Sequence, residues 1–248
     1  MIMSEQTRRV RFYTGLEDVN SNKCYTTEMR FSNNCSTKKS IKYIIIVLSF
    51  VLLTLMTGCY LVKAHYDFAL QEVEVPDKSG LIQTEAKIVR LYENYLTKYA
   101  YEDNLIRIVW QPTTSAMKFS LANKSKYSLK ILWDDAAYVD VNGKSLRVMH
   151  LGTKYNDREK TQLPTVVVRN GTIYDLVYPV DYVAYYGSSL GWVEHPLFPV
   201  VGNSIYELST KALQYKDKTF QILLPLLIDG VTYEYIFVFK INNVMVKG

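Results

Sequence analysis

Twenty consecutive uncharged residues, 43–62, constrain this chain more than any other feature. At about 1.5 Å per residue, a helix of this length spans about 30 Å, the thickness of the hydrocarbon core of a bilayer. Lys38, Lys39 and Lys42 precede the segment and Lys63 follows it. The pattern predicts a membrane-spanning signal or anchor helix over residues 43–62.

A short motif near the end of this segment, Leu55-Met56-Thr57-Gly58-Cys59, resembles the lipobox of bacterial lipoproteins. In that family, small residues precede a cysteine that receives lipid and becomes the mature N-terminus. The resemblance implies lipidation of Cys59, for example with palmitate, and membrane lipid as a partner. The alternative is a single-pass anchor, in which residues 1–42 stay in the cytoplasm and Cys59 is an ordinary residue of the membrane helix.

The segment before the hydrophobic run, residues 1–42, forms a basic N-terminal tail or leader. Its length exceeds that of an ordinary signal peptide, whereas a start at Met29 gives ordinary proportions. Translation from Met1, Met3 or Met29 is therefore left open.

Charge is divided unevenly along the chain. Residues 1–58 carry eight Lys and Arg against four acids, which gives +4 of the net +5. The other 190 residues carry the remaining 21 basic and 20 acidic groups, or +1. Positive charge before a membrane segment keeps that side in the cytoplasm, so residues 63–248 are expected outside it. A nearly neutral exported part disfavours nucleic acid as a partner.

The composition of the exported part favours strands. The chain has 21 Tyr, 9 Phe and 3 Trp, and aromatic residues are enriched in sheets. Its three cysteines, Cys24, Cys35 and Cys59, all precede residue 60, so the exported domain has no disulfide and depends on its core. Residues 63–80, which contain Pro76 and Gly80, are expected to form a tether.

Two periodicities divide residues 81–248. Over residues 81–103, Ile88, Tyr92, Tyr95 and Tyr99 recur at three- and four-residue spacing, which predicts one amphipathic helix. From residue 105 onward, apolar residues alternate with a period of two. The dipeptides Asn142-Gly143, Asn170-Gly171 and Asp229-Gly230 favour type I′ hairpin turns. The expected fold is mainly β, an immunoglobulin-like antiparallel β-sandwich with one N-terminal helix.

The best candidates for binding lie in residues 179–202, which are expected to be the longest irregular loop. If the loop's aromatic side chains are exposed together, they form a patch suited to a glycan, peptide or protein; otherwise they belong to the core. These aromatic residues are Tyr182, Tyr185, Tyr186, Trp192 and Phe198.

Catalysis has little support in the sequence. The three histidines, His65, His150 and His195, form none of the usual zinc motifs, and no metal or cofactor is expected. Residues 187–191 read Gly-Ser-Ser-Leu-Gly, with Ser189 in the place of a nucleophile, but that motif requires a strand-to-helix turn in an α/β sheet.

The sequence therefore favours a membrane-anchored binding or structural module of the cell envelope, whose partner is another envelope protein or a polysaccharide. The alternatives are an envelope hydrolase that uses Ser189 and His195, or a single-pass anchored subunit of an envelope complex.

Overall fold

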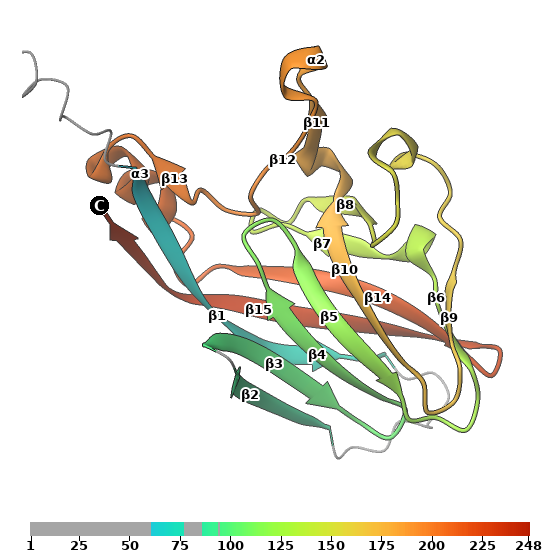
Figure 1. Cartoon of the computed structure of the whole chain (residues 1–248). Coiled ribbons are helices and arrows are strands. Elements are labelled where there is room, and N and C mark those ends of the chain that lie inside the picture. Colours follow the sequence, from blue (N-terminus) through green and yellow to red (C-terminus); the bar gives the residue numbers. More distant parts are fainter. Residues whose placement is uncertain (1–60, 77–85, 94) are drawn as a thin grey trace, which may run out of the picture. The chain divides into compact units, whose positions relative to one another are not determined.

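The computed structural model describes residues 61–76, 86–93 and 95–248 (Figure 1). The predicted leader, Cys59 and all but the last two residues of the predicted membrane segment lie outside these ranges. Within the described ranges, no helix is both long enough and apolar enough to cross a bilayer. All the described elements belong to one compact unit, residues 59–248.

The described part of the chain is mainly β. Its strands and longer helix are β1 (Val62–Glu74), β2 (Lys87–Glu93), β3 (Leu96–Glu102), β4 (Ile106–Pro112), β5 (Met117–Asn123), β6 (Leu129–Ile131), β7 (Ala137–Val139), β8 (Ser145–Met149), β9 (Thr165–Val167), β10 (Thr172–Pro179), β11 (Val183–Tyr185), β12 (Trp192–Glu194), β13 (Val201–Gly202), α3 (Ile205–Leu213), β14 (Thr219–Ile228) and β15 (Val231–Lys247). The short helical turns are η1 (Trp133–Asp135), η2 (Tyr155–Asp157), η3 (Val180–Tyr182) and α2 (Gly187–Leu190).

Nearly all the strands belong to one sheet that folds back on itself. The strand order is β13-β1-β15-β14-β7-β8-β10-β5-β4-β3-β2, with β6 and β9 attached beside β14. Strands β1, β15 and β14 form one layer and β3, β4 and β5 the other (Figure 1). The pairings between described strands are antiparallel. The predicted antiparallel β class is confirmed, and the two layers are consistent with a β-sandwich.

Aromatic rings join the two layers. Trp110 of β4 lies 5.1 Å from Phe237 of β15, and Tyr101 of β3 lies 6.1 Å from Tyr235, measured between ring centroids. All four side chains are almost fully buried. Alternation along β15 brings every second side chain into this interior, as the sequence pattern predicts.

One buried carboxylate reinforces the aromatic contacts. Asp103, in the turn between β3 and β4, accepts hydrogen bonds from the hydroxyls of Tyr101 (3.1 Å) and Tyr235 (2.8 Å). It also accepts bonds from the backbone N–H groups of Leu105 and Ile106. Burial, with Asp103 beside it, raises the pKa of Tyr235 well above its usual range. Asp103 therefore joins the β3–β4 turn to the opposite layer.

The three predicted turn dipeptides have different outcomes. Asp229 and Gly230 both adopt positive φ (49° and 78°) between paired Ile228 and Val231, so a tight β14–β15 hairpin is confirmed. Asn142-Gly143 lies in a longer β7–β8 connection, whose backbone donates to the Asp140 carboxylate. Asn170-Gly171 does not close a hairpin, because β9 pairs with β6 while β10 pairs with β5 and β8.

The tether predicted over residues 63–80 is wrong for its first part. Strand β1 occupies Val62–Glu74 and lies against the long strand β15, from the pair Lys63 and Lys247 to the pair Glu74 and Ile236. The charged residues of this segment suggested an extended linker. They lie instead on the more exposed positions of a strand whose Val62, Ala64 and Leu70 are buried.

The helix predicted over residues 81–103 is also wrong in the described part of that range. Strands β2 and β3 form an antiparallel hairpin there, from the pair Lys87 and Glu102 to the pair Glu93 and Leu96. The helical spacing of the tyrosines is coincidental. Tyr99 and Tyr101, two residues apart, enter the core on strand β3, which the next strand β4 holds in place.

The β2–β3 turn offers a test that separates a hairpin from a helix. Tyr95 adopts φ of 63° and is 91% exposed, so its ring stabilises little while its backbone is strained. Tyr95→Gly should therefore raise the free energy of unfolding by about 0.5–1 kcal/mol. In a helix, the same change should lower it by about 1 kcal/mol.

Urea unfolding of the full chain in detergent measures this difference. Tyr92→Gly is the matched control, because Tyr92 is an exposed residue within strand β2 and its replacement should destabilise the domain. Destabilisation by Tyr95→Gly as large as that by Tyr92→Gly would contradict the hairpin.

Candidate functional site

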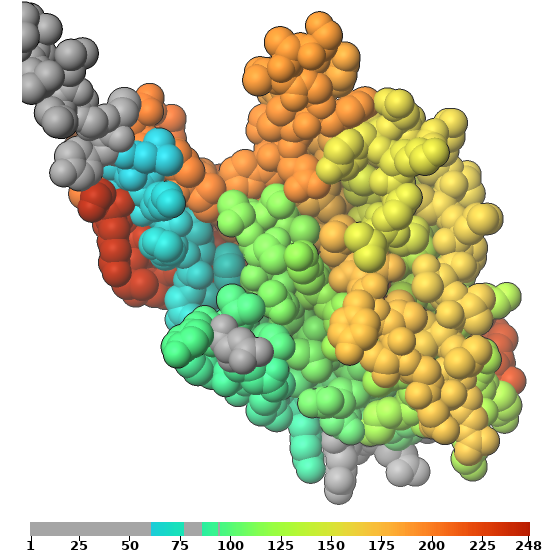
Figure 2. All heavy atoms as spheres, viewed as in Figure 1, coloured from blue at the N-terminus to red at the C-terminus, as the bar shows by residue number. Residues whose placement is uncertain are grey.

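Residues 179–202 are not an irregular loop, as the sequence suggested, but contain a small second sheet. Strands β11 and β12 pair from Val183 and Glu194 to Tyr185 and Trp192, and the single-turn helix α2 closes their end. Gly187 and Gly191, which border this turn, both adopt positive φ. The hairpin stands away from the sandwich (Figures 1 and 2).

The five aromatic candidates separate into core and surface. Phe198 is only 5% exposed and belongs to the main core, with its ring 5.1 Å from Tyr66 and 5.4 Å from Phe220. Tyr182 is half-buried, and burial raises its pKa. Its carbonyl oxygen accepts hydrogen bonds from the Tyr178 hydroxyl and the His195 backbone N–H. The prediction of one aromatic patch is therefore wrong for Phe198.

The remaining three candidates lie on the projecting hairpin. Tyr185 and Tyr186 are exposed, and Trp192 is half-buried. The Trp192 ring lies 5.2 Å from that of Tyr185, its partner across the β11–β12 ladder. Cross-strand aromatic pairs of this kind stabilise a hairpin. The ladder therefore presents two large rings side by side.

Two residues distant in sequence complete the surroundings of Trp192. The ring of Tyr155, in η2, lies 5.7 Å away, and the guanidinium of Arg158 lies 4.9 Å from the centre of the Trp192 ring. A cation over an indole face is favourable and holds the ring in place. Sequence reasoning missed both residues, since the connection between β8 and β9 carries no periodic pattern.

An open cleft of about 670 Å³ lies beside this aromatic group. Its walls come from the start of β5, the β8–β9 connection, β10 and β12. Among the residues that line it are Ser115, Lys118, Met149, Tyr155, Trp192 and Glu194. The volume lies in the range typical of small-ligand sites, and the lining combines apolar surface with a few polar groups.

Glu194 of β12 is hydrogen-bonded to residues of two other walls of the cleft. Its carboxylate accepts hydrogen bonds from the Tyr155 hydroxyl (2.6 Å) and from the Ser115 hydroxyl (3.1 Å). The pKa of the Tyr155 hydroxyl is raised, mainly by its hydrogen bond to Glu194 and to a smaller extent by partial burial. These bonds join η2 and the residues before β5 to strand β12, which gives the cleft beside Trp192 a defined shape.

His150 lies at another wall of the cleft, with the carboxylate of Asp175 beside it. The Nδ1 atom of His150 is 3.3 Å from Oδ2 of Asp175, and its ring stacks on Trp133 at 4.3 Å. The other Asp175 oxygen accepts the backbone N–H groups of Leu151 and Leu176. Asp175 thereby fixes the β8–β9 connection to β10, and His150 contributes a polar edge to the cleft.

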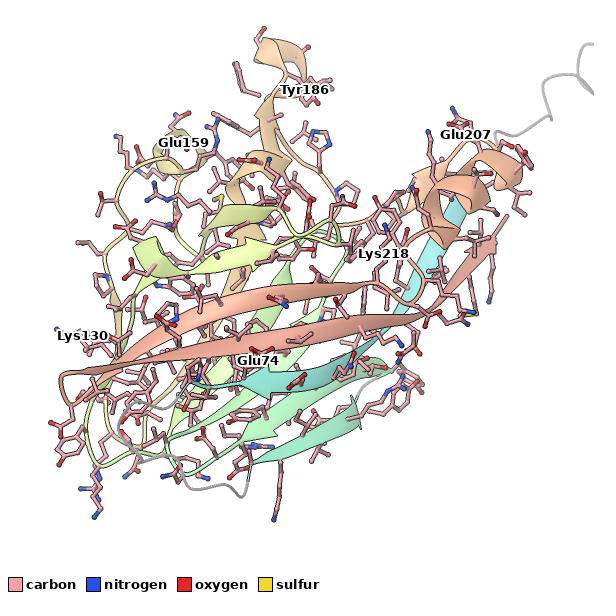
Figure 3. The ribbon with its side chains drawn as sticks, turned by 180° about the vertical axis from the view of Figure 1, so that it is seen from behind. Glu74, Lys130, Glu159, Tyr186, Glu207 and Lys218 are labelled. Atoms are coloured by element: carbon pink, nitrogen blue, oxygen red, sulfur yellow. The ribbon has the colours of Figure 1, made fainter. Side chains whose placement is uncertain are left out.

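The nucleophile and base considered from sequence are not joined in this structure. His195 Nε2 lies 3.0 Å from the Tyr186 hydroxyl, whereas among the described residues no hydrogen bond connects His195 with Ser189. Ser189 lies on the exposed helix α2, outside the cleft. Figure 3 shows the region around Tyr186 from behind. In the same described ranges, no cluster of three or more metal-ligating side chains occurs.

Comparisons with protein-family models, with curated proteins and with solved structures returned no match to this chain. The site is therefore interpreted from its own geometry.

The division of the aromatic residues into core and surface has a direct test. Phe198→Ala removes a ring from the main core and should lower the free energy of unfolding by about 3–5 kcal/mol. Trp192→Ala removes a few ring contacts at the surface and should lower it by about 1 kcal/mol. Urea unfolding of the full chain in detergent gives both values. Equal losses, or a larger loss for Trp192, would contradict the assignment.

Proposed function

We propose that this chain is a membrane-anchored extracytoplasmic binding module, and that its ligand is a segment of envelope polysaccharide bound in the cleft beside Trp192. The anchor is Cys59 of a lipoprotein or, as the alternative, the single membrane span predicted over residues 43–62, whose last residue, Val62, lies in strand β1. The observation that carries the binding function is that Trp192 and Tyr155 line the cleft together, with the Tyr185 ring packed beside Trp192.

A polysaccharide suits this cleft for two chemical reasons. The carbon-bound hydrogens of a sugar ring pack on aromatic faces, and the neighbouring rings of Trp192 and Tyr155 line this cleft. Sugar hydroxyls also need donors and acceptors nearby, which Lys118, Ser115 and Glu194 supply. An open cleft admits the middle of a long chain, whereas a closed pocket admits only an end.

The rest of the domain acts as a rigid scaffold for this site. Immunoglobulin-like sandwiches present binding loops at one end of a packed core. We infer that here, too, the core supports the site and the connections at one end bind the ligand. The hairpin β11–β12 and the β8–β9 connection have the role of such loops. The hydrolase alternative requires a bond between Ser189 and His195, and the contact of His195 with Tyr186 argues against it.

Loss of Trp192 should weaken binding far more than it weakens the fold. Binding energy concentrates in a few aromatic anchors, whose truncation costs about 2 kcal/mol, or about thirtyfold in affinity. We therefore expect Trp192→Ala to reduce co-sedimentation of the full chain with purified envelope polysaccharide about thirtyfold. Tyr174→Ala is the control, because Tyr174 is an exposed tyrosine outside the lining of the cleft.

Three outcomes distinguish the possible partners. Binding by the wild type that Trp192→Ala abolishes and Tyr174→Ala preserves supports the proposal. Equal binding by both variants places the ligand elsewhere. Capture of an envelope protein through the cleft, with no binding of polysaccharide, replaces the proposed ligand with the second partner class.

A further inference from the structure

The described domain begins almost at the proposed anchor. Strand β1 starts at Val62, three residues after Cys59. Three extended residues span at most about 11 Å. Whether lipid on Cys59 or the span predicted over residues 43–62 holds the chain, the start of β1 lies close to the bilayer surface.

Three other elements share this end of the domain. Gly202 of β13 pairs with Val62, and Lys247 near the C-terminus pairs with Lys63. Helix α3 packs over them so closely that a Cβ added to Gly202 would lie 2.9 Å from the Cβ of Leu208. Figure 1 shows α3, β13, the start of β1 and the C-terminus together.

This end carries exposed apolar side chains. On α3, Leu208 and Ala212 are buried, whereas Ile205, Tyr206 and Leu213 are exposed. At about 100° per residue, the three exposed side chains fall within an arc of about 100°, and Glu207 and Lys211 lie on the opposite side. Exposed apolar residues continue on the neighbouring segments with Leu61, Val201 and Met245.

Basic residues accompany these apolar side chains. Lys63 and Lys247 lie directly opposite each other on adjacent strands, an arrangement that is unfavourable unless an anion lies nearby. Lys211 of α3 does not add to this charge, because it lies on the opposite side of the helix and pairs with Glu207 at 2.7 Å. Among the described residues neither Lys63 nor Lys247 forms an ion pair, and an anionic lipid headgroup would supply the missing negative charge. Apolar side chains flanked by lysines are typical of surfaces that bind bilayers.

We propose that the end formed by α3, β13 and the first residues of β1 rests on the bilayer, with Ile205, Tyr206 and Leu213 at the level of the lipid headgroups. This inference depends on the proposed membrane anchor and adds a second contact to it. The domain is then held in one orientation, instead of swinging on a tether. The proposed partner of this surface is anionic lipid. Binding of a second copy of the chain to the same surface is the alternative that the experiment below must exclude.

Photocrosslinking to lipid tests this contact. The full chain is reconstituted in vesicles of phosphatidylglycerol and phosphatidylethanolamine, with photoreactive benzoylphenylalanine in place of Tyr206 or, as the control, Tyr174. The two tyrosines are matched, at 80% and 78% exposure. After irradiation, mass spectrometry should find at least tenfold more lipid adduct at position 206 than at position 174. Equal yields, or crosslinks from 206 to a second copy, would overturn the proposal.

A second variant pair tests the apolar face itself. With the photoreactive residue in place of Leu213, Ile205→Asp should reduce lipid adducts several-fold. Val166→Asp should leave them unchanged, although Val166 is as exposed as Ile205 (53% and 54%). Unchanged adducts in Ile205→Asp would contradict the docking surface.

Flotation of the vesicles distinguishes failure of the membrane anchor from failure of the bilayer contact at α3. A chain that floats with the vesicles in high salt without lipid adducts at position 206 retains the anchor and refutes the docking. A chain that fails to float contradicts the anchor, and with it the docking.

Discussion

The contact on which this fold most depends is the buried carboxylate of Asp103. It accepts hydrogen bonds from the hydroxyls of Tyr101 and Tyr235 and from two backbone N–H groups, so that the β3–β4 turn of one layer is fixed to strand β15 of the other. A buried carboxylate is costly unless it is fully hydrogen-bonded, and here four donors satisfy it. The domain holds its layers by this network and by the aromatic core around it, without a disulfide in the described residues.

Much of the sheet could be predicted from the sequence. The alternation from residue 105 onward predicted the region of strands β4, β5, β8, β14 and β15. The dipeptide Asp229-Gly230 predicted the hairpin between the last two. The helical spacing of Ile88, Tyr92, Tyr95 and Tyr99 was misleading because tertiary pairing outweighed it. An exposed edge strand such as β2 buries little, so its own pattern is weakly constrained.

The candidate site was only partly predictable. Sequence reasoning identified the hairpin aromatics Tyr185, Tyr186 and Trp192, since an aromatic cluster with nearby glycines favours a presented loop. It could not place Phe198 in the core, because burial there depends on rings from β1 and β14. It also could not find Tyr155 and Arg158, because only the folded chain brings η2 beside Trp192.

The proposed binding function and the proposed bilayer contact both require this domain to lie outside the cytoplasm. Alkaline phosphatase, joined by a flexible linker after Gly248, measures that position directly because the enzyme becomes active only after export. If the domain is exported, phosphatase activity should be high in intact cells and should be lost when residues 1–60 are removed. An inactive phosphatase fusion, with β-galactosidase fully active at the same point, would contradict export of the domain.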